Sequence, residues 1–148
     1  MVDSFKKKVD GPEQPCLVGC IPKDYIGFST NPKMWVLIDE CETLMFADKI
    51  KKFNQSAWKQ DRILLVTSEN VYNVKKDKVK RRIKIGSLIG VSKALLGAKI
   101  EFTLHVQSEY DYRFQSEKRN EIVDAIKRAY AEKFKKNLPV YGIEKEKL

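Results

Sequence analysis

The sequence predicts a mainly β protein with some α-helix: a seven-stranded antiparallel sandwich or barrel, closed by a C-terminal helix and preceded by a short N-terminal helix. Apolar and polar residues alternate with a period of two in several short segments between residues 44 and 114. Turn-forming residues separate these segments. Apolar residues then recur every three or four positions between residues 122 and 134, as in an amphipathic helix.

Length and composition are those of a single soluble domain. The chain has 148 residues, of which 43% are hydrophobic and 33% are charged, which suits one modest core and disfavours disorder. No window reaches the roughly 18 uninterrupted apolar residues of a membrane span, and the basic N-terminus lacks the apolar stretch of a secretory signal. We therefore expect a cytoplasmic protein that meets a membrane only by its surface.

An extended arm is expected over residues 1–23, which prolines and glycines interrupt. A short helix should follow, because Asn31 can cap it and Pro32 suits its first turn. This helix should end near residues 40–42, and its apolar stripe consists of Met34, Trp35, Leu37 and Ile38.

Short strands should occupy most of the middle of the chain, with turns at 68–70 and 76–78. The expected strands are 44–53, 62–67, 71–75, 79–85, 88–93, 100–107 and 110–114. Within 79–85, alternation places Val79, Ile83 and Ile85 on one face and Lys80, Arg82 and Lys84 on the other. One face of the sheet should therefore be strongly basic.

The last element should be a helix that begins at Ser116, a good N-cap, and ends before Leu138-Pro139. Its apolar stripe consists of Ile122, Val123, Ile126, Ala129, Tyr130 and Phe134. The stripe could lie in a membrane plane, but covering the open end of the sandwich is favoured, because a half-open barrel needs a cover. Seven strands followed by one helix is the pleckstrin-homology architecture.

Basic residues are concentrated in one part of the chain, whose net charge is +9. Residues 49–84 hold 12 of the 29 basic residues and three of the 20 acidic ones, so this window accounts for the whole excess. Such a concentration indicates an electrostatic face for a polyanion. Each Lys or Arg near an anionic lipid leaflet contributes about 1 kcal/mol. The simpler alternative is that solvated lysines only keep the domain soluble.

No catalytic, metal or cofactor site is expected. The one histidine, His105, lies in an alternating segment with no nucleophile–base pair evident, and there is no glycine-rich phosphate loop. The odd number of cysteines and the missing signal sequence favour reduced thiols. A zinc site built from Cys16, Cys20, Cys41 and His105 would need three distant segments to converge, and is disfavoured.

A series of short motifs runs between residues 24 and 139. In chain order they are DYIG at 24–27, NP at 31–32, FAD at 46–48, RILLVT at 62–67, VY at 71–72, KRRI at 80–83, LIGVS at 88–92 and LP at 138–139. Together, in order and spacing, they resemble the tail homology 1 domain of class I myosins. The resemblance implies a pleckstrin-homology-like domain over 24–139 that binds anionic phospholipids, phosphoinositides especially. No motor or light-chain-binding helix is present, so we expect a stand-alone domain with a tail at 140–148.

The resemblance also implies a lipid site. The family pairs a basic residue late in the first strand with an arginine that opens the second, and Lys52 and Arg62 match these positions. Lys59, in the connecting loop, can add a third contact. Residues 53–56 (FNQS) depart from the family, which usually has a hydrophobic-Asp-Arg-Arg-like run there. The cations expected to compensate by general electrostatics are Lys80, Arg81, Arg82 and Lys84.

Two functions remain open. The first is a non-catalytic adaptor that binds anionic membrane lipids at the membrane periphery. The second is a structural subunit of a large cytoskeletal or ciliary assembly, such as a microtubule or axoneme, because the arm at 1–23 needs a partner to order it and an acidic filament would suit the basic face. Nucleic acid is disfavoured, because residues 49–84 lack a series of stacking aromatic rings.

Overall fold

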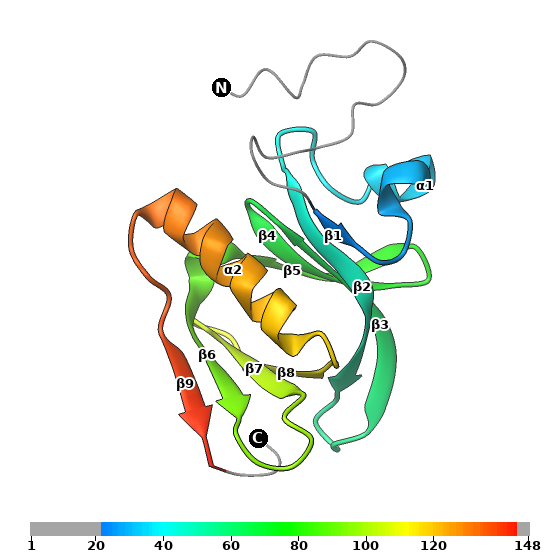
Figure 1. The fold of residues 1–148 in the computed structure, drawn as a ribbon. Helices are drawn as coiled ribbons and strands as arrows, with labels where there is room; N and C mark the ends of the chain where they lie inside the picture. The colour runs from blue at the N-terminus through cyan, green and yellow to red at the C-terminus, as the bar shows by residue number, and fades with distance from the viewer. Residues whose placement is uncertain (1–21, 145–148) are drawn as a thin grey trace.

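The computed structural model describes residues 22–144 and contains one nine-stranded sheet that curls around a central core (Figure 1). Seven strands form the predicted antiparallel sandwich: β2 (Leu44–Phe53), β3 (Lys59–Thr67), β4 (Asn70–Lys75), β5 (Lys78–Lys84), β6 (Leu88–Ala94), β7 (Glu101–Val106) and β8 (Tyr112–Gln115). Across the sheet they lie in the order β5-β4-β3-β2-β8-β7-β6, so the pairing of β2 with β8 joins the two halves. The predicted mainly β class with a C-terminal helix is confirmed.

Two short strands were not predicted. β1 (Lys23–Asp24) pairs in parallel with β2, and β9 (Val140–Ile143) pairs in parallel with β6. Residues 140–143 are therefore part of the sheet and not of a tail beyond it. Of the expected arm, residues 1–21 lie outside the described residues.

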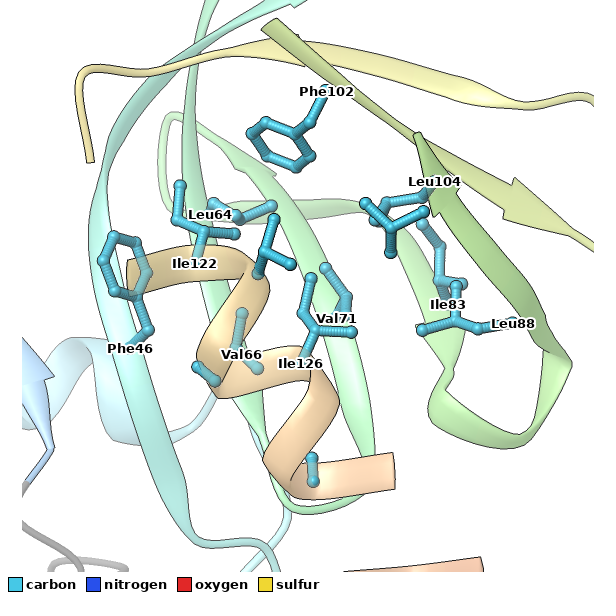
Figure 2. Close-up of a cluster of buried hydrophobic side chains, with 14 of the residues drawn as sticks. Phe46, Leu64, Val66, Val71, Ile83, Leu88, Phe102, Leu104, Ile122 and Ile126 are labelled. Carbon is cyan, nitrogen blue, oxygen red and sulfur yellow. The ribbon is translucent and has the colours of Figure 1, made fainter. Parts of the chain in front are cut away.

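The C-terminal helix α2 (Arg119–Phe134) closes the inner core, as the sequence predicted. Figure 2 shows Ile122 and Ile126 directed at Leu64, Val66 and Val71 of the sheet, and all five are buried. The stripe is thus used inside the protein, which argues against an in-plane membrane helix. Ser116 does not cap the helix: its hydroxyl accepts the N–H of Lys118, and the helix begins one residue later.

A second core lies on the outer face of β2, β3 and β4. The N-terminal helix α1 (Pro32–Trp35) covers this face, and is capped by the Asn31 side chain as expected. It ends several residues earlier than predicted. Leu37 and Ile38, which were expected within the helix, instead pack from the segment that follows it. Trp35, the last residue of α1, donates from Nε1 to the carbonyl of Phe28 at 2.6 Å. The buried members of this second core are Phe28, Met34, Ile38, Leu44, Ala47, Leu65, Tyr72 and Val74.

The DYIG and FAD motifs fasten the N-terminal segment to the domain. Asp24 accepts the backbone N–H groups of Phe28 and Ser29, both at 2.9 Å. The Tyr25 ring packs against Phe46 in a tilted arrangement, and its hydroxyl donates to Glu121 of α2. Residues of these motifs therefore stabilise the fold through contacts within the protein, without a ligand.

Alternation in β5 is broken by a β-bulge opposite Asn73 and Val74. Val79 pairs with Val74 on the outer face, whereas Ile83 pairs with Val71 in the inner core. The prediction that Val79 and Ile83 share a face is therefore wrong, because the extra residue shifts the alternation by one.

Candidate anion-binding site

The β2–β3 hairpin carries the basic residues singled out by the resemblance. Its loop, residues 54–58, is held by Asn54, whose side-chain oxygen accepts the N–H groups of Ser56 at 2.9 Å and Trp58 at 3.0 Å. The backbone of Asn54 also donates to the carbonyl of Trp58 at 3.0 Å. The residues that depart from the family pattern thus give the loop a fixed shape.

Lys52 and Arg62 lie close together at the end of the inner core. Lys52 is paired with Gln60 and Arg62 with Ile50, so both cations are on the inner face and diagonal to each other. Burial, and then the positive charge of Arg62, lower the pKa of Lys52. Neither side chain forms a salt bridge with any residue between 22 and 144. Two neighbouring cations that form no salt bridge attract an anion.

The guanidinium of Arg62 is only partly satisfied within the protein. Nη1 donates to the carbonyl of Asp61 at 2.8 Å, and Nη2 approaches Gln60 Oε1 at 3.4 Å. Nε is buried and has no hydrogen-bond partner among the described residues. Each Nη carries two N–H groups and engages one of them, so the other N–H groups of the guanidinium fork suit a phosphate oxygen.

A hollow of about 650 Å³ beside Arg62 brings in cations that sequence reasoning had not assigned to the site. Lys49 comes from β2, Lys75 is the last residue of β4, and Lys76 lies in the β4–β5 turn. Lys76 and Asp77 have φ values of 50° and 63° in this turn. The only signal for these lysines was their place in the basic window, because the turn approaches Arg62 through tertiary folding. Lys52 lies diagonal to Arg62 but lines another hollow, beside the 54–58 loop. We call Arg62, its neighbour Lys52, and Lys75 and Lys76 across the hollow the cation cluster.

The other predicted site residues lie elsewhere. Lys59 pairs with Phe53 and lines a different hollow, on the other side of the 54–58 loop from Lys52. Arg82 and Lys84 pair with Tyr72 and Asn70 on the outer face of β5.

Lys80 and Arg81 are separated by the bulge. Lys80 is the exposed residue that the bulge inserts. Arg81 points to the inner face, where Tyr112 and then Glu109 raise its pKa through hydrogen bonds. The structure therefore brings Lys52 and Arg62 together, and leaves Lys59, Lys80, Arg82 and Lys84 outside the cation cluster.

One hydrogen-bonded chain was missed by the sequence analysis. Ser92 Oγ lies 2.6 Å from His105 Nε2, and His105 Nδ1 lies 2.7 Å from Asp111 Oδ2. The statement that His105 has no nucleophile partner is therefore wrong. However, Ser92 is only 7% exposed, and it lies in β6 between β7 and β9, where backbone N–H groups belong to the sheet ladders. A hydrolytic triad needs an accessible serine and free oxyanion donors. The Ser92–His105–Asp111 hydrogen bonds are therefore structural: they form a cross-strand brace that links β6 to β7 and to the loop after it.

The described part of the chain has neither a metal-binding cluster nor a helix that could span a membrane. Residues 22–144 contain no group of three His, Cys, Asp or Glu side chains that could hold a metal ion. Cys41 is a free, exposed thiol, and Cys16 and Cys20 lie outside the described residues. Neither described helix has the length and apolar character that crossing a membrane requires.

Solved structures place the fold in the pleckstrin-homology class. The chain is similar to the hSac2 domain from the human phosphoinositide phosphatase Sac2, with a TM-score of 0.59 and 17% identity over 78% of this chain and 85% of that one. It is also similar to the pleckstrin-homology domain of human oxysterol binding protein-related protein 11, with a TM-score of 0.50 and 14% identity over 62% of this chain and 86% of that one. At these identities the likeness concerns the fold alone.

A match to a protein-family model identifies the family within this fold class. The model of the unconventional myosin tail, described as actin- and lipid-binding, matches residues 22–142. The chain therefore belongs to the myosin tail homology 1 family, as its motifs indicated.

Proposed function

We propose that this chain is a non-catalytic adaptor that binds anionic phospholipids, phosphoinositides in particular, through the cation cluster. The observation that carries the proposal is the Lys52–Arg62 pair, which is partly buried and forms no salt bridge with any residue between 22 and 144. Placing two like charges together is unfavourable in the free protein. An anion between them removes the repulsion and is bound for that reason.

The geometry suits a headgroup with more than one phosphate. Arg62 offers guanidinium donors from β3, and Lys52 approaches from β2. Lys75 and Lys76 approach from the end of β4 and the β4–β5 turn across the hollow beside Arg62. Arg62, Lys75 and Lys76 line one hollow, and Lys52 lies diagonal to Arg62 on the sheet, so these cations can contact separate phosphate oxygens. The protein would then work at the cytoplasmic face of a membrane.

Vesicle sedimentation tests this proposal. The variant Lys52→Ala/Arg62→Ala should bind phosphoinositide-containing vesicles at least about tenfold more weakly, since two charged contacts are lost. The matched control is Lys127→Ala/Arg128→Ala, which removes the same charge from exposed positions on α2. If wild-type protein does not sediment with anionic vesicles at low salt, or if both variants lose binding equally, the proposed site is wrong.

A second candidate function is binding to an acidic filament through β5. This strand is at one edge of the sheet, and Lys78, Lys80, Arg82 and Lys84 on it are all exposed. The family description names actin, and a microtubule or axoneme would offer the same negative charge. Edge lysines also prevent strand-to-strand aggregation, which is the simpler explanation. Cosedimentation with actin filaments and with microtubules, using Arg82→Glu/Lys84→Glu, separates this candidate from lipid binding.

A further inference from the structure

Two loops at the same end of the molecule expose large apolar side chains. Trp58, in the β2–β3 loop, is 72% exposed, and Leu96, in the β6–β7 loop, is 49% exposed. Figure 1 shows these loops side by side, and residues next to both, Ala57 and Gly97, line one hollow of about 440 Å³. Apolar side chains that gather in one exposed region, unlike singly scattered ones, mark a contact surface for a partner or a membrane.

The surroundings of this hollow are basic. Lys59 and Lys99 line it, and neither forms a salt bridge with any residue between 22 and 144. The acidic residue of the lining, Glu101, is only 6% exposed and is bound to Arg113 at 2.9 Å. The hollow therefore presents net positive charge beside the two apolar side chains.

The first loop is rigid enough to hold its tryptophan outward. The side chain of Asn54 accepts the backbone N–H of Trp58, and the backbone of Asn54 donates to its carbonyl. The guanidinium of Arg113 lies 4.0 Å from the centre of the Phe53 ring at the base of the loop. The exposure of Trp58 is thus built into a braced loop and does not arise from a loose one.

We propose that the 54–58 and 95–100 loops form one membrane-contact surface, in which Trp58 and Leu96 enter the interfacial layer of an anionic bilayer while Lys59 and Lys99 contact lipid phosphates. Indole rings favour the region between headgroups and acyl chains, because one end of the ring is apolar and the other is polar. Lysine stems beside them reach the phosphate level while keeping the ammonium hydrated. The 54–58 loop separates this surface from Lys52, which lines the hollow on its other side.

A bilayer fits these observations better than a protein partner does. The apolar residues are at loop tips and not in a continuous groove, and unpaired cations flank them, as an anionic leaflet requires. The inference rests on the proposed lipid-binding function and adds an insertion step to it. It also gives Lys59 a role separate from the Lys52–Arg62 pair.

Tryptophan fluorescence tests the insertion directly. The chain has two tryptophans, and the other one, Trp35, is half-buried in the second core. With vesicles of phosphatidylcholine and phosphatidylserine in equal parts, wild-type emission should shift to the blue, and phosphatidylcholine brominated on its acyl chains should quench it. The variant Trp58→Phe, which keeps Trp35, should show neither change.

Sedimentation with the same vesicles gives a second measurement. Trp58→Ser and Leu96→Ser should each weaken binding about three- to tenfold, since each removes apolar surface from the interface. The matched control is Val36→Ser: Val36 is 81% exposed and follows α1, at the far end of the molecule (Figure 1). This control should bind as the wild type does.

The outcomes separate the two proposals. If the wild type does not sediment with these vesicles or with phosphoinositide vesicles, the lipid-binding function and the insertion both fail. If it sediments, but Trp58 is neither shifted nor quenched, the insertion alone is wrong and lipid binding stands. A blue shift that follows protein concentration without lipid would assign the surface to a contact between copies of the chain, and would overturn the insertion.

Discussion

The positive charge of Lys52 should lower the free energy of unfolding of the domain. Its ammonium is diagonal to the guanidinium of Arg62 on the inner face, and burial together with this neighbour lowers the pKa of Lys52. The substitution Lys52→Met removes the charge and keeps an unbranched side chain of similar length opposite Phe114. We expect this variant to unfold at a higher temperature than the wild type and to lose anion binding.

The magnitude follows from the register. Diagonal neighbours in a sheet are about 7–8 Å apart, so two unit charges repel by about 0.6 kcal/mol in water and about 2 kcal/mol at an effective dielectric constant near 20. Lys52 is half-buried, and solvent screening reduces the upper figure. We therefore expect Lys52→Met to raise the free energy of unfolding by about 0.5–1 kcal/mol, which corresponds to a rise in Tm of about 1–4 °C for a domain of this size.

Thermal unfolding followed by circular dichroism measures this gain. It should shrink at about 1 M salt, where the Debye length is about 3 Å. The folded state lowers the pKa of Lys52 from 10.5, so the destabilisation is present below the lowered pKa and disappears as the pH rises past 10.5. The control is Lys51→Met on the opposite face, which breaks the exposed Lys51–Asp61 ion pair and should bring no gain. A lower Tm for Lys52→Met would refute the inference that the charge of Lys52 destabilises the folded protein.

Three further predictions concern the frame around the site. Asp24→Asn should lower the free energy of unfolding by about 1–2 kcal/mol. Burial alone would raise the pKa of Asp24, but the backbone N–H groups that its carboxylate accepts outweigh burial and lower this pKa. The stability difference from the wild type, measured by urea titration, should therefore be present above pH 3.8 and fade as the pH falls through the lowered pKa. Gly90→Val should release β9, because even a Cβ at this position would lie 2.9 Å from the Tyr141 ring; faster amide exchange confined to residues 140–143 is the expected sign, and unchanged exchange would contradict it. Ser92 should not react with a fluorophosphonate probe, because it is buried in a strand with its N–H groups paired; covalent labelling that His105→Ala abolishes would show that the brace is catalytic.

Local patterns were enough to find the main strands. In β7, apolar and polar residues alternate over the whole strand, although residues of both faces are buried. β2 begins with four apolar residues in a row, because both of its faces are covered there, and alternates only further along. β1 and β9 were missed, since two or four residues carry too little periodicity to distinguish a strand from a loop. The bulge in β5 also escaped, because an inserted residue leaves no mark in an alternating sequence until its partner strand is known.

The site was found only in part for a similar reason. Lys52 and Arg62 are ten residues apart on two strands of one hairpin, so a hairpin register and a family resemblance suffice to bring them together. Lys75 and Lys76 lie at the end of β4 and in the turn that follows, and nothing local says that this turn faces Arg62. The Ser92–His105–Asp111 chain joins two strands and a loop in the same way, and each of its residues looks unremarkable in its own segment.

The sequence by itself determined the β class, the covering helix and the concentration of charge, because periodicity, capping residues and composition are local properties of the chain. The order and spacing of its short motifs indicated the family. The tertiary structure alone decided which cations share a face, which acidic groups neutralise others, and which apolar residues stay exposed at the loop tips. The physical reason is that electrostatic and packing energies depend on distances between segments, and these are set only when the sheet has curled and both of its faces have been covered.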